Sequence, residues 1–210
     1  MPISKRGPGP NWCCIAPHKS KALPVETKAL ARALIGWSLV RTSPEGTTKG
    51  RIVETEAYLT GDPASHAFRG ESPRNRAMFG PPFHAYVYRI YGRYWCVNVT
   101  SETDGCGAAV LIRALEPTEG LALMQARRGT DELRLLCSGP GRLAAALDID
   151  RSLEGRDLRG DSELRLDPPE RAAGAIGISR RIGVTAAAQR LLRFYERGNP
   201  FVSGPKALSP

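Results

Sequence analysis

The sequence predicts a single α+β domain built on a curved antiparallel β-sheet, with a protruding β-hairpin and flanking helices. Three observations lead to this prediction: strand-like segments dominate the middle of the chain, helical patterns occur toward its ends, and two aromatic strands flank a short turn. The 210 residues suit one domain with a sizeable core. We assign residues 23–203 to the domain, 1–22 to a flexible basic arm and 204–210 to a tail.

The first elements follow from hydrophobic periodicity. Apolar residues at helical spacing over 25–35, followed by Gly36, predict a helix. Apolar runs predict strands over 38–42 and 50–59. Residues 60–82 are rich in Pro, Gly and Arg and predict a long loop.

The strongest local signal is the hairpin. Residues 85–91 and 94–100 form two aromatic strands around Gly92-Arg93, which predicts a two-residue turn with Gly at its first position. The later elements are predicted as a strand over 108–115, helices over 118–128 and 141–147, extended segments over 162–166 and 174–183, a short helix over 185–192 and a closing strand over 193–202.

The charge of the chain is strongly positive. Thirty Lys and Arg residues against 21 Asp and Glu give a net charge of +9, and 24 of the 30 are Arg. This surplus favours a polyanionic partner, because guanidinium groups suit phosphate recognition; a compositional bias toward Arg is the alternative. Residues 1–22 carry basic residues and no acid, so we interpret them as a mobile basic arm that adds affinity or as a tail without a role.

Composition also excludes several classes. No apolar run approaches the roughly 20 residues that a membrane helix needs, and the N-terminus lacks an apolar signal core. We therefore expect a cytoplasmic protein, nucleoid-associated if bacterial, with no membrane partner. Five Cys without C-x-x-C spacing favour reduced thiols; a partial metal site at Cys13, Cys14 and His18 is a weak alternative.

Two acidic residues occupy alternate positions of one predicted strand. Strand period places Ile52, Glu54, Glu56 and Tyr58 on one face. Carboxylates on an apolar strand are unfavourable in a core. Three interpretations stay open: a solvated face, a structural ion pair, or a general base whose pKa is raised by burial beside a Tyr.

Arginines and aromatic rings alternate in the loop that follows. Arg69, Arg74 and Arg76 on a turn-rich segment suit contacts to phosphate. His66 is interpreted as a structural histidine or as part of a site. Arg142 follows Ser-Gly-Pro-Gly at a predicted helix start, which is a weak phosphate-binding signal.

The hairpin presents a ring at its tip. Alternation places Tyr86, Tyr88 and Ile90 on one face, and Val87, Arg89 and Tyr91 on the other. An aromatic residue at a protruding tip, with Arg93 beside it, can insert between base pairs or stack on a base. The alternative is ordinary aromatic packing in the sheet, which suits Tyr86 and Tyr88 better than the tip residue Tyr91.

These segments together resemble the alkyladenine (3-methyladenine) DNA glycosylase family of animals and many bacteria. The central motif is Glu-Thr-Glu-Ala-Tyr at 54–58. The matching segments are residues 30–36, 50–58, 62–66, 73–79, 86–92, 96–98, 111–117, 136–140, 181–184 and 192–195. They occur in family order over most of the chain, outside the basic arm.

The resemblance implies an enzyme that flips a damaged purine out of double-stranded DNA and hydrolyses its N-glycosidic bond, as a monomer and without a cofactor or metal. Carried over residue by residue, it gives seven site residues. Glu56 matches the general base that activates water, and Arg113 matches an arginine that helps to hold the water or the adjacent backbone. Tyr58, His66 and Tyr88 match the residues that contact the flipped base. Asn98 matches the pocket residue that disfavours guanine by crowding its exocyclic amino group, and Tyr91 matches the wedge that fills the vacated stack. Arg89 and Trp95 depart from the family pattern, which puts the breadth of accepted bases in doubt.

The chemistry fits this resemblance. An alkylated purine is a good leaving group, so extraction, stacking and a carboxylate-activated water suffice. Strand cleavage by a lyase needs an amine, and no Lys occurs between Lys49 and Lys206. Pro2 would offer an amine if Met1 is removed, as in formamidopyrimidine glycosylases, but the sequence after it does not resemble theirs. The alternatives are a non-catalytic nucleic-acid-binding module, and a nuclease that would need clustered acids for Mg²⁺.

Overall fold

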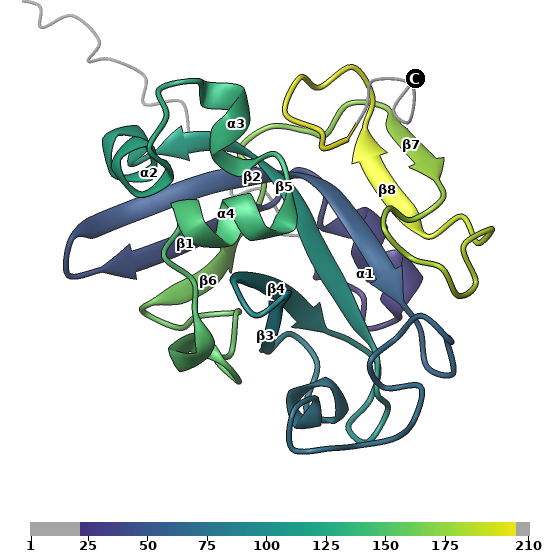
Figure 1. Cartoon of the computed structure of the whole chain (residues 1–210). Helices are drawn as coiled ribbons and strands as arrows, with labels where there is room; N and C mark the ends of the chain where they lie inside the picture. Colours follow the sequence, from purple (N-terminus) through teal and green to yellow (C-terminus); the bar gives the residue numbers. More distant parts are fainter. Residues whose placement is uncertain (1–21, 205–210) are drawn as a thin grey trace, which may run out of the picture.

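The computed structural model describes residues 22–204 and confirms a single α+β domain with a curved antiparallel sheet (Figure 1). The basic arm, with Cys13, Cys14 and His18, and the C-terminal tail lie outside the described residues except at 22 and 204. The strands of the described part are β1 (Ser38–Ser43), β2 (Gly46–Tyr58), β3 (Ala85–Ile90), β4 (Tyr94–Thr100), β5 (Ala109–Glu119), β6 (Leu164–Asp167), β7 (Ile176–Ser179) and β8 (Arg193–Glu196).

Strand β2 is the centre of the sheet. The strand order is β3-β4-β5-β2-β1-β6, and β8, which also pairs with β7, adds to β2. Every pairing is antiparallel. The first half of β2 pairs with β1 and its second half with β8, while β5 runs along the other edge. The backbone around Glu54 and Glu56 is therefore held from both sides, which fixes where their side chains start.

The helices differ from the sequence prediction at their boundaries. The α-helices of the described residues are α1 (Thr27–Ala33), α2 (Leu121–Arg128), α3 (Leu133–Cys137) and α4 (Pro140–Ala146), and the 3₁₀ turns are η1 (Arg76–Phe79) and η2 (Arg151–Leu153). The side chain of Glu26 caps α1 by accepting from the amides of Lys28 and Ala29. Helix α3 is absent from the sequence prediction.

Two predicted helices need correction. The predicted helix 118–128 begins only at Leu121, because β5 continues to Glu119 and Gly120 then turns with a φ of 72°. A Cβ on Gly120 would lie 2.3 Å from the carbonyl oxygen of Thr47, so only glycine fits there. The predicted helix 185–192 is wrong, since this segment has a turn at 186–189 and irregular backbone on both sides of it.

The hairpin is confirmed, but its loop has three residues, Tyr91, Gly92 and Arg93, where a two-residue turn was predicted. Ile90 pairs with Tyr94, and the amide of Arg93 donates to the carbonyl of Ile90 at 3.1 Å. Within this loop, Tyr91 and Gly92 are the central residues of the turn from Ile90 to Arg93, with φ of 52° and 62°. Positive φ at both positions is the type I′ signature that matches strand twist. Tyr91 is therefore part of the turn rather than the last strand residue.

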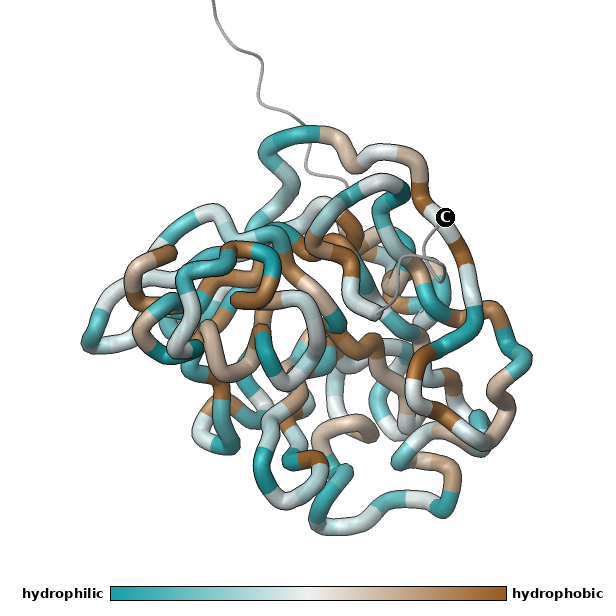
Figure 2. Tube along the Cα trace, turned by 45° about the horizontal axis from the view of Figure 1, so that its top comes forward, coloured by the Kyte–Doolittle hydropathy of each residue, from teal (hydrophilic) through white to brown (hydrophobic). Residues whose placement is uncertain are grey.

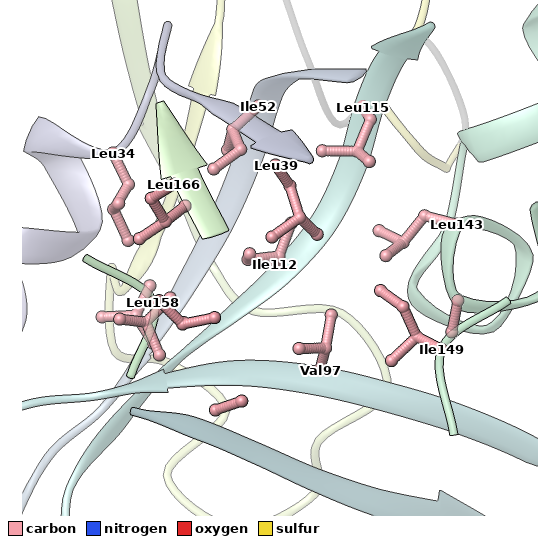
Figure 3. Packing of buried hydrophobic residues seen from close by; sticks show 14 of the residues in the cluster. Leu34, Leu39, Ile52, Val97, Ile112, Leu115, Leu143, Ile149, Leu158 and Leu166 are labelled. Carbon is pink, nitrogen blue, oxygen red and sulfur yellow. The ribbon is translucent and has the colours of Figure 1, made fainter. Parts of the chain in front are cut away.

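The core lies between the sheet and the helices that cover it. Leu34 at the C-cap of α1, Ile52 of β2 and Leu143 of α4 belong to one buried cluster, part of which Figure 3 shows. Along the chain trace in Figure 2, hydrophobic stretches run through the interior while many outer turns are hydrophilic. The aromatic residues Tyr86 and Tyr88 are not in this cluster: Tyr86 is buried in a separate small one with Met78, against which Tyr88 packs.

Candidate active site

One pocket gathers most of the residues singled out from the sequence. It has a volume of about 300 Å³, which suits a single flat heterocycle. Its walls come from β2, the loop after it, β3, the hairpin turn, β4, β5, the start of α4 and the segment 182–184. The lining residues are Tyr58, Ala64, His66, Met78, Tyr86, Tyr88, Ile90, Tyr91, Cys96, Asn98, Leu111, Arg113, Pro140, Ile182, Gly183 and Val184.

The two strand carboxylates are both buried. Glu54 and Glu56 are 0% exposed, so the interpretation as a solvated face is wrong. The placement of Ile52 on their face is also wrong, because Ile52 packs into the main core together with Ala57. The register of β2 against β5 shifts on both sides of Glu54, and such a bulge interrupts the alternation of side chains.

Glu56 lies directly behind the pocket lining. Its Oε2 accepts a hydrogen bond from the Tyr58 hydroxyl at 2.9 Å and lies 3.3 Å from Nη1 of Arg113. Its Oε1 accepts from the amide of Ile182 at 2.7 Å. All three partners line the pocket. A carboxylate offers about four acceptor positions, so this arrangement orients Glu56 and leaves one position to spare.

The pKa of Glu56 is shifted upward by its surroundings. Burial is the main cause, and the charge of Glu54 adds to it; Arg113, the Ile182 amide and the Tyr58 hydroxyl act in the opposite direction. Burial likewise raises the pKa of Tyr58, followed by the charge of Glu56. Tyr58 therefore stays protonated and acts as a donor, while Glu56 combines burial with basicity, as a general base requires.

Glu54 forms a structural ion-pair network behind Glu56. Its Oε1 accepts from Nε of Arg193 at 2.6 Å and from Nε of Arg113 at 3.1 Å, and its Oε2 accepts from the amide of Ser203 at 2.7 Å. Arg193 is itself 0% exposed. The structural-ion-pair interpretation thus fits Glu54, while Glu56, whose partners line the pocket, leaves the general-base interpretation open.

Aromatic rings form the opposite wall. Nδ1 of His66 lies 2.9 Å from the Tyr86 hydroxyl, and its ring meets the Tyr88 ring edge-on at 4.6 Å between centroids. Burial, followed by the charge of Arg74, lowers the pKa of His66, so the ring is neutral near pH 7. The side-chain amide of Asn98 donates to the carbonyl of Tyr86 at 2.9 Å, which holds Asn98 in the lining.

The tip residue Tyr91 is 86% exposed and still borders the pocket. It was predicted on the face opposite Tyr88; the structure corrects this, because the turn conformation at Tyr91 ends the strand alternation. An exposed ring beside the pocket mouth matches the geometry that a wedge needs.

The five arginines expected at phosphates are all exposed, but they differ in their contacts. Arg76 pairs with Glu71 at 3.0 Å, and Arg74 donates to the carbonyl of Arg89 at 3.2 Å. Nη1 of Arg142 donates to the carbonyl and the hydroxyl of Ser138, which lies two residues before Pro140 of the pocket lining. Arg93 lies 5.4 Å from the Tyr94 ring, two residues from Tyr91. Arg69 lies on the loop beyond His66, within the same exposed stretch as Phe68.

Several site residues give no local signal in the sequence. The Ile182 amide is a backbone group in a loop, and the contacts of Arg193 and Ser203 with Glu54 span more than 130 positions. The buried arginine in the apolar run 192–195 is the one clue, since a charge in such a strand needs a partner. Within the described residues, no group of three potential metal ligands occurs and no helix is long and apolar enough to cross a membrane.

Comparison with known proteins agrees with the resemblance. Residues 21–200 match the family described as Methylpurine-DNA glycosylase (MPG). A protein of Mesorhizobium japonicum named "Putative 3-methyladenine DNA glycosylase" is 56% identical over 91% of this chain and 92% of its own length. Proteins of the same name in Methanoculleus marisnigri and Paraburkholderia phytofirmans are 54% and 46% identical, over 85% and 92% of this chain and 94% and 91% of theirs.

Proposed function

The chain belongs to the methylpurine-DNA glycosylase family, and from this premise we propose that it is a monofunctional glycosylase for alkylated or otherwise damaged purines in double-stranded DNA. The observation that carries the proposal is the position of Glu56, buried directly behind a pocket that is lined by tyrosines, a histidine and an arginine. A non-catalytic binding module, the alternative, has no use for a buried carboxylate behind its pocket.

Recognition begins with extrusion of the nucleotide. A base inside a duplex cannot reach a pocket, so it must be flipped out at a cost of a few kcal/mol. The Tyr91 ring enters the vacated stack and recovers part of that cost. The base then lies among Tyr58, His66 and Tyr88, whose rings give broad stacking surfaces for a flat and often cationic purine. Asn98 borders the same space and disfavours guanine by contact with its exocyclic amino group.

Hydrolysis follows by carboxylate-assisted attack of water. A water molecule admitted with the nucleotide gives its proton to Glu56 and bonds to C1′ of the sugar. The bond from C1′ to the purine nitrogen breaks, and the base leaves with the electron pair. Alkylation makes the base cationic and a good leaving group, so no metal or cofactor is required. Arg113 holds Glu56 in place and stabilises its charged form.

Strand cleavage is not part of the proposed activity. A lyase reaction needs an amine that forms a Schiff base with the sugar, and the chain has no Lys from 50 to 205. The pocket, the general base and the wedge all come from one chain. We therefore propose that the monomer is the active form and that residues 23–203 are sufficient for catalysis.

The test is release of free base from defined duplexes. Duplexes that each carry one damaged purine are incubated with excess protein in EDTA, and the base is detected by mass. We expect free base, intact abasic strands and no covalent adduct on borohydride trapping. Failure to release any of a panel of alkylated purines would overturn the proposal, and a trapped adduct would overturn its monofunctional part.

A further inference from the structure

Asp62 and Arg181 form a buried ion pair beside the pocket for which the proposed reaction has no use. Both side chains are 0% exposed. Nη1 and Nη2 of Arg181 donate to the two carboxylate oxygens at 2.5 and 3.1 Å. Nη1 also donates to the carbonyl of Ala57, between Glu56 and Tyr58, at 3.0 Å. The pair therefore ties the segment that leads into Ile182 to the end of β2.

The guanidinium of Arg181 also faces Tyr58. Its central carbon lies 4.6 Å from the centroid of the Tyr58 ring, within the range of a cation–π contact. The hydroxyl of this ring donates to Glu56, and the residue after Arg181 supplies the amide that donates to the other oxygen of Glu56. Two of the donors that hold Glu56 are thus held by Arg181.

Asp62 anchors the other side of the pocket as well. Its side chain accepts from the amide of Ala64 at 3.1 Å, and its carbonyl accepts from the amide of Ser65 at 2.8 Å, which shapes the turn before His66. Arg190, at the far end of the loop that begins at Arg181, lies 3.8 Å from the same carboxylate. One buried carboxylate therefore holds both the turn that carries His66 and the loop that carries Ile182.

We propose that Asp62 and Arg181 are positioning residues which together hold the Ile182 amide and the Tyr58 hydroxyl on the carboxylate of Glu56, and so keep the general base ionised. This inference rests on the proposed function of Glu56. It gives a role to the buried pair in the segments 62–66 and 181–184, which line part of the pocket but carry no group that reacts.

The consequence is a dependence of activity on pH. The groups that act on Glu56 from the elements around it are Glu54 and Tyr58 on β2, Arg113 on β5, Arg193 on β8 through Glu54, and the Ile182 amide next to Arg181. The amide and the hydroxyl both lower the pKa of Glu56 against the effect of burial. If the Asp62–Arg181 pair is broken, these donors move away and the pKa of Glu56 rises further.

The experiment is the pH profile of single-turnover excision in the full chain. The substrate is a duplex with one cationic alkylated adenine such as N3-methyladenine, which lacks the exocyclic amino group of guanine that Asn98 disfavours and whose ring needs no further proton, so the acid limb reports groups of the protein. In Asp62→Asn we expect the midpoint of this limb to move up by about one pH unit, a tenfold change in proton affinity. The rate on the alkaline plateau should fall by no more than about threefold.

The matched control is Glu196→Gln. Glu196 and Arg51 form another buried two-bond ion pair, at 2.5 and 2.6 Å, on a part of the sheet away from the pocket. We expect this variant to lose thermal stability and to keep the wild-type midpoint. Arg181→Lys keeps the charge but cannot contact both oxygens of Asp62 and the carbonyl of Ala57 at the same time. It should shift the midpoint in the same direction as Asp62→Asn, and it provides the test if Asp62→Asn does not fold.

Three results separate the possibilities. A uniform loss of rate with an unchanged midpoint in the folded Asp62 or Arg181 variant overturns the positioning role, because it indicates a structural effect only. An equal shift in Glu196→Gln overturns it too. If the wild-type chain releases no base, or if Glu56→Gln excises at the wild-type rate, the proposed function itself fails. These outcomes differ from an unchanged midpoint and from a shift in the control, which overturn the positioning role alone.

Discussion

Nη1 of Arg113 lies 3.3 Å from Oε2 of Glu56, while its Nε lies 3.1 Å from Oε1 of Glu54. One guanidinium thus stands between two carboxylates that are both shielded from water. A buried acid without a partner would be neutral. A cation that contacts one oxygen of each carboxylate favours the charged form of both. The two carboxylates therefore have different roles: Glu54 holds Arg113 in position, and Arg113 stabilises the charged form of Glu56.

The Glu54→Gln variant should therefore lose stability more than activity. It leaves Arg113 and Arg193 without their shared charge, which we expect to cost about 3–5 kcal/mol in the free energy of unfolding. Excision per folded molecule should fall by roughly tenfold, since catalysis by a general base accounts for about 10²–10⁴ and Glu56 remains. Urea melts and single-turnover rates check this. A greater catalytic loss in Glu54→Gln than in Glu56→Gln would show that Glu54, and not Glu56, is the general base.

Replacement of Tyr91 should affect DNA and not folding. The ring is almost fully exposed, so Tyr91→Ala should keep the melting temperature and lose about 1–3 kcal/mol of lesion affinity. The loss should be greatest for a well-paired lesion and smallest for a mismatched one. Tyr91→Phe should keep the function, because the ring is the wedge.

The backbone at Tyr91 supplies a control for this variant. Its φ is 52°, a conformation that glycine adopts without strain. Tyr91→Gly should thus be at least as stable as Tyr91→Ala while binding as poorly. If Tyr91→Ala melts much lower and keeps its affinity per folded molecule, Tyr91 is a packing residue and the wedge assignment fails.

The exposed arginines should contribute unequally to the salt dependence of DNA binding. Each phosphate contact adds about 0.9 to the slope of log affinity against log salt. Arg93→Ala should lower the slope by about that amount. Arg76→Ala should change it less, because Arg76 already pairs with Glu71. Affinity titrations at several salt concentrations measure both, and a slope that is flat in the wild type would contradict phosphate binding altogether.

Glu196 should make the fold sensitive to acid. The hydrogen bond from Arg51 lowers the pKa of Glu196 to about 2, below its ordinary value, so the pair stabilises the fold above the unfolded pKa near 4.5. That stability is lost as the pH falls from about 4.5 toward 2. Glu196→Gln should lower stability at pH 7 by about 3–5 kcal/mol and should flatten the acid dependence of the unfolding midpoint. An acid limb as steep as in the wild type would place the sensitive carboxylate elsewhere.

The sequence predicted elements that depend on local patterns. The helix capped at Glu26, the aromatic hairpin and the carboxylate strand follow from periodicity and turn chemistry. The failures have physical causes as well. The bulge at Glu54 breaks the alternation that placed Ile52 beside it, and the segment 185–192, which has helical composition, forms a turn and irregular backbone with Arg190 near Asp62.

The site was predicted only in part for the same reason. The resemblance to a family points to Glu56, Tyr58 and Arg113, and the structure brings them together at the pocket. The groups that hold these residues in place come from distant parts of the chain: the Ile182 amide, the Ser203 amide and the Asp62–Arg181 pair. Such contacts depend on the closure of the sheet and leave no pattern at short range.

The most direct test of the account is single-turnover excision by Glu56→Gln. The amide keeps the size of the side chain and can still accept from Ile182, but it cannot take a proton from water. With a duplex that carries one alkylated purine, in EDTA and with enzyme in excess, we expect release of the base to fall by at least about 100-fold, with the melting temperature and DNA affinity near those of the wild type. Excision by folded Glu56→Gln within a few-fold of the wild-type rate would contradict the assignment of Glu56 as the general base.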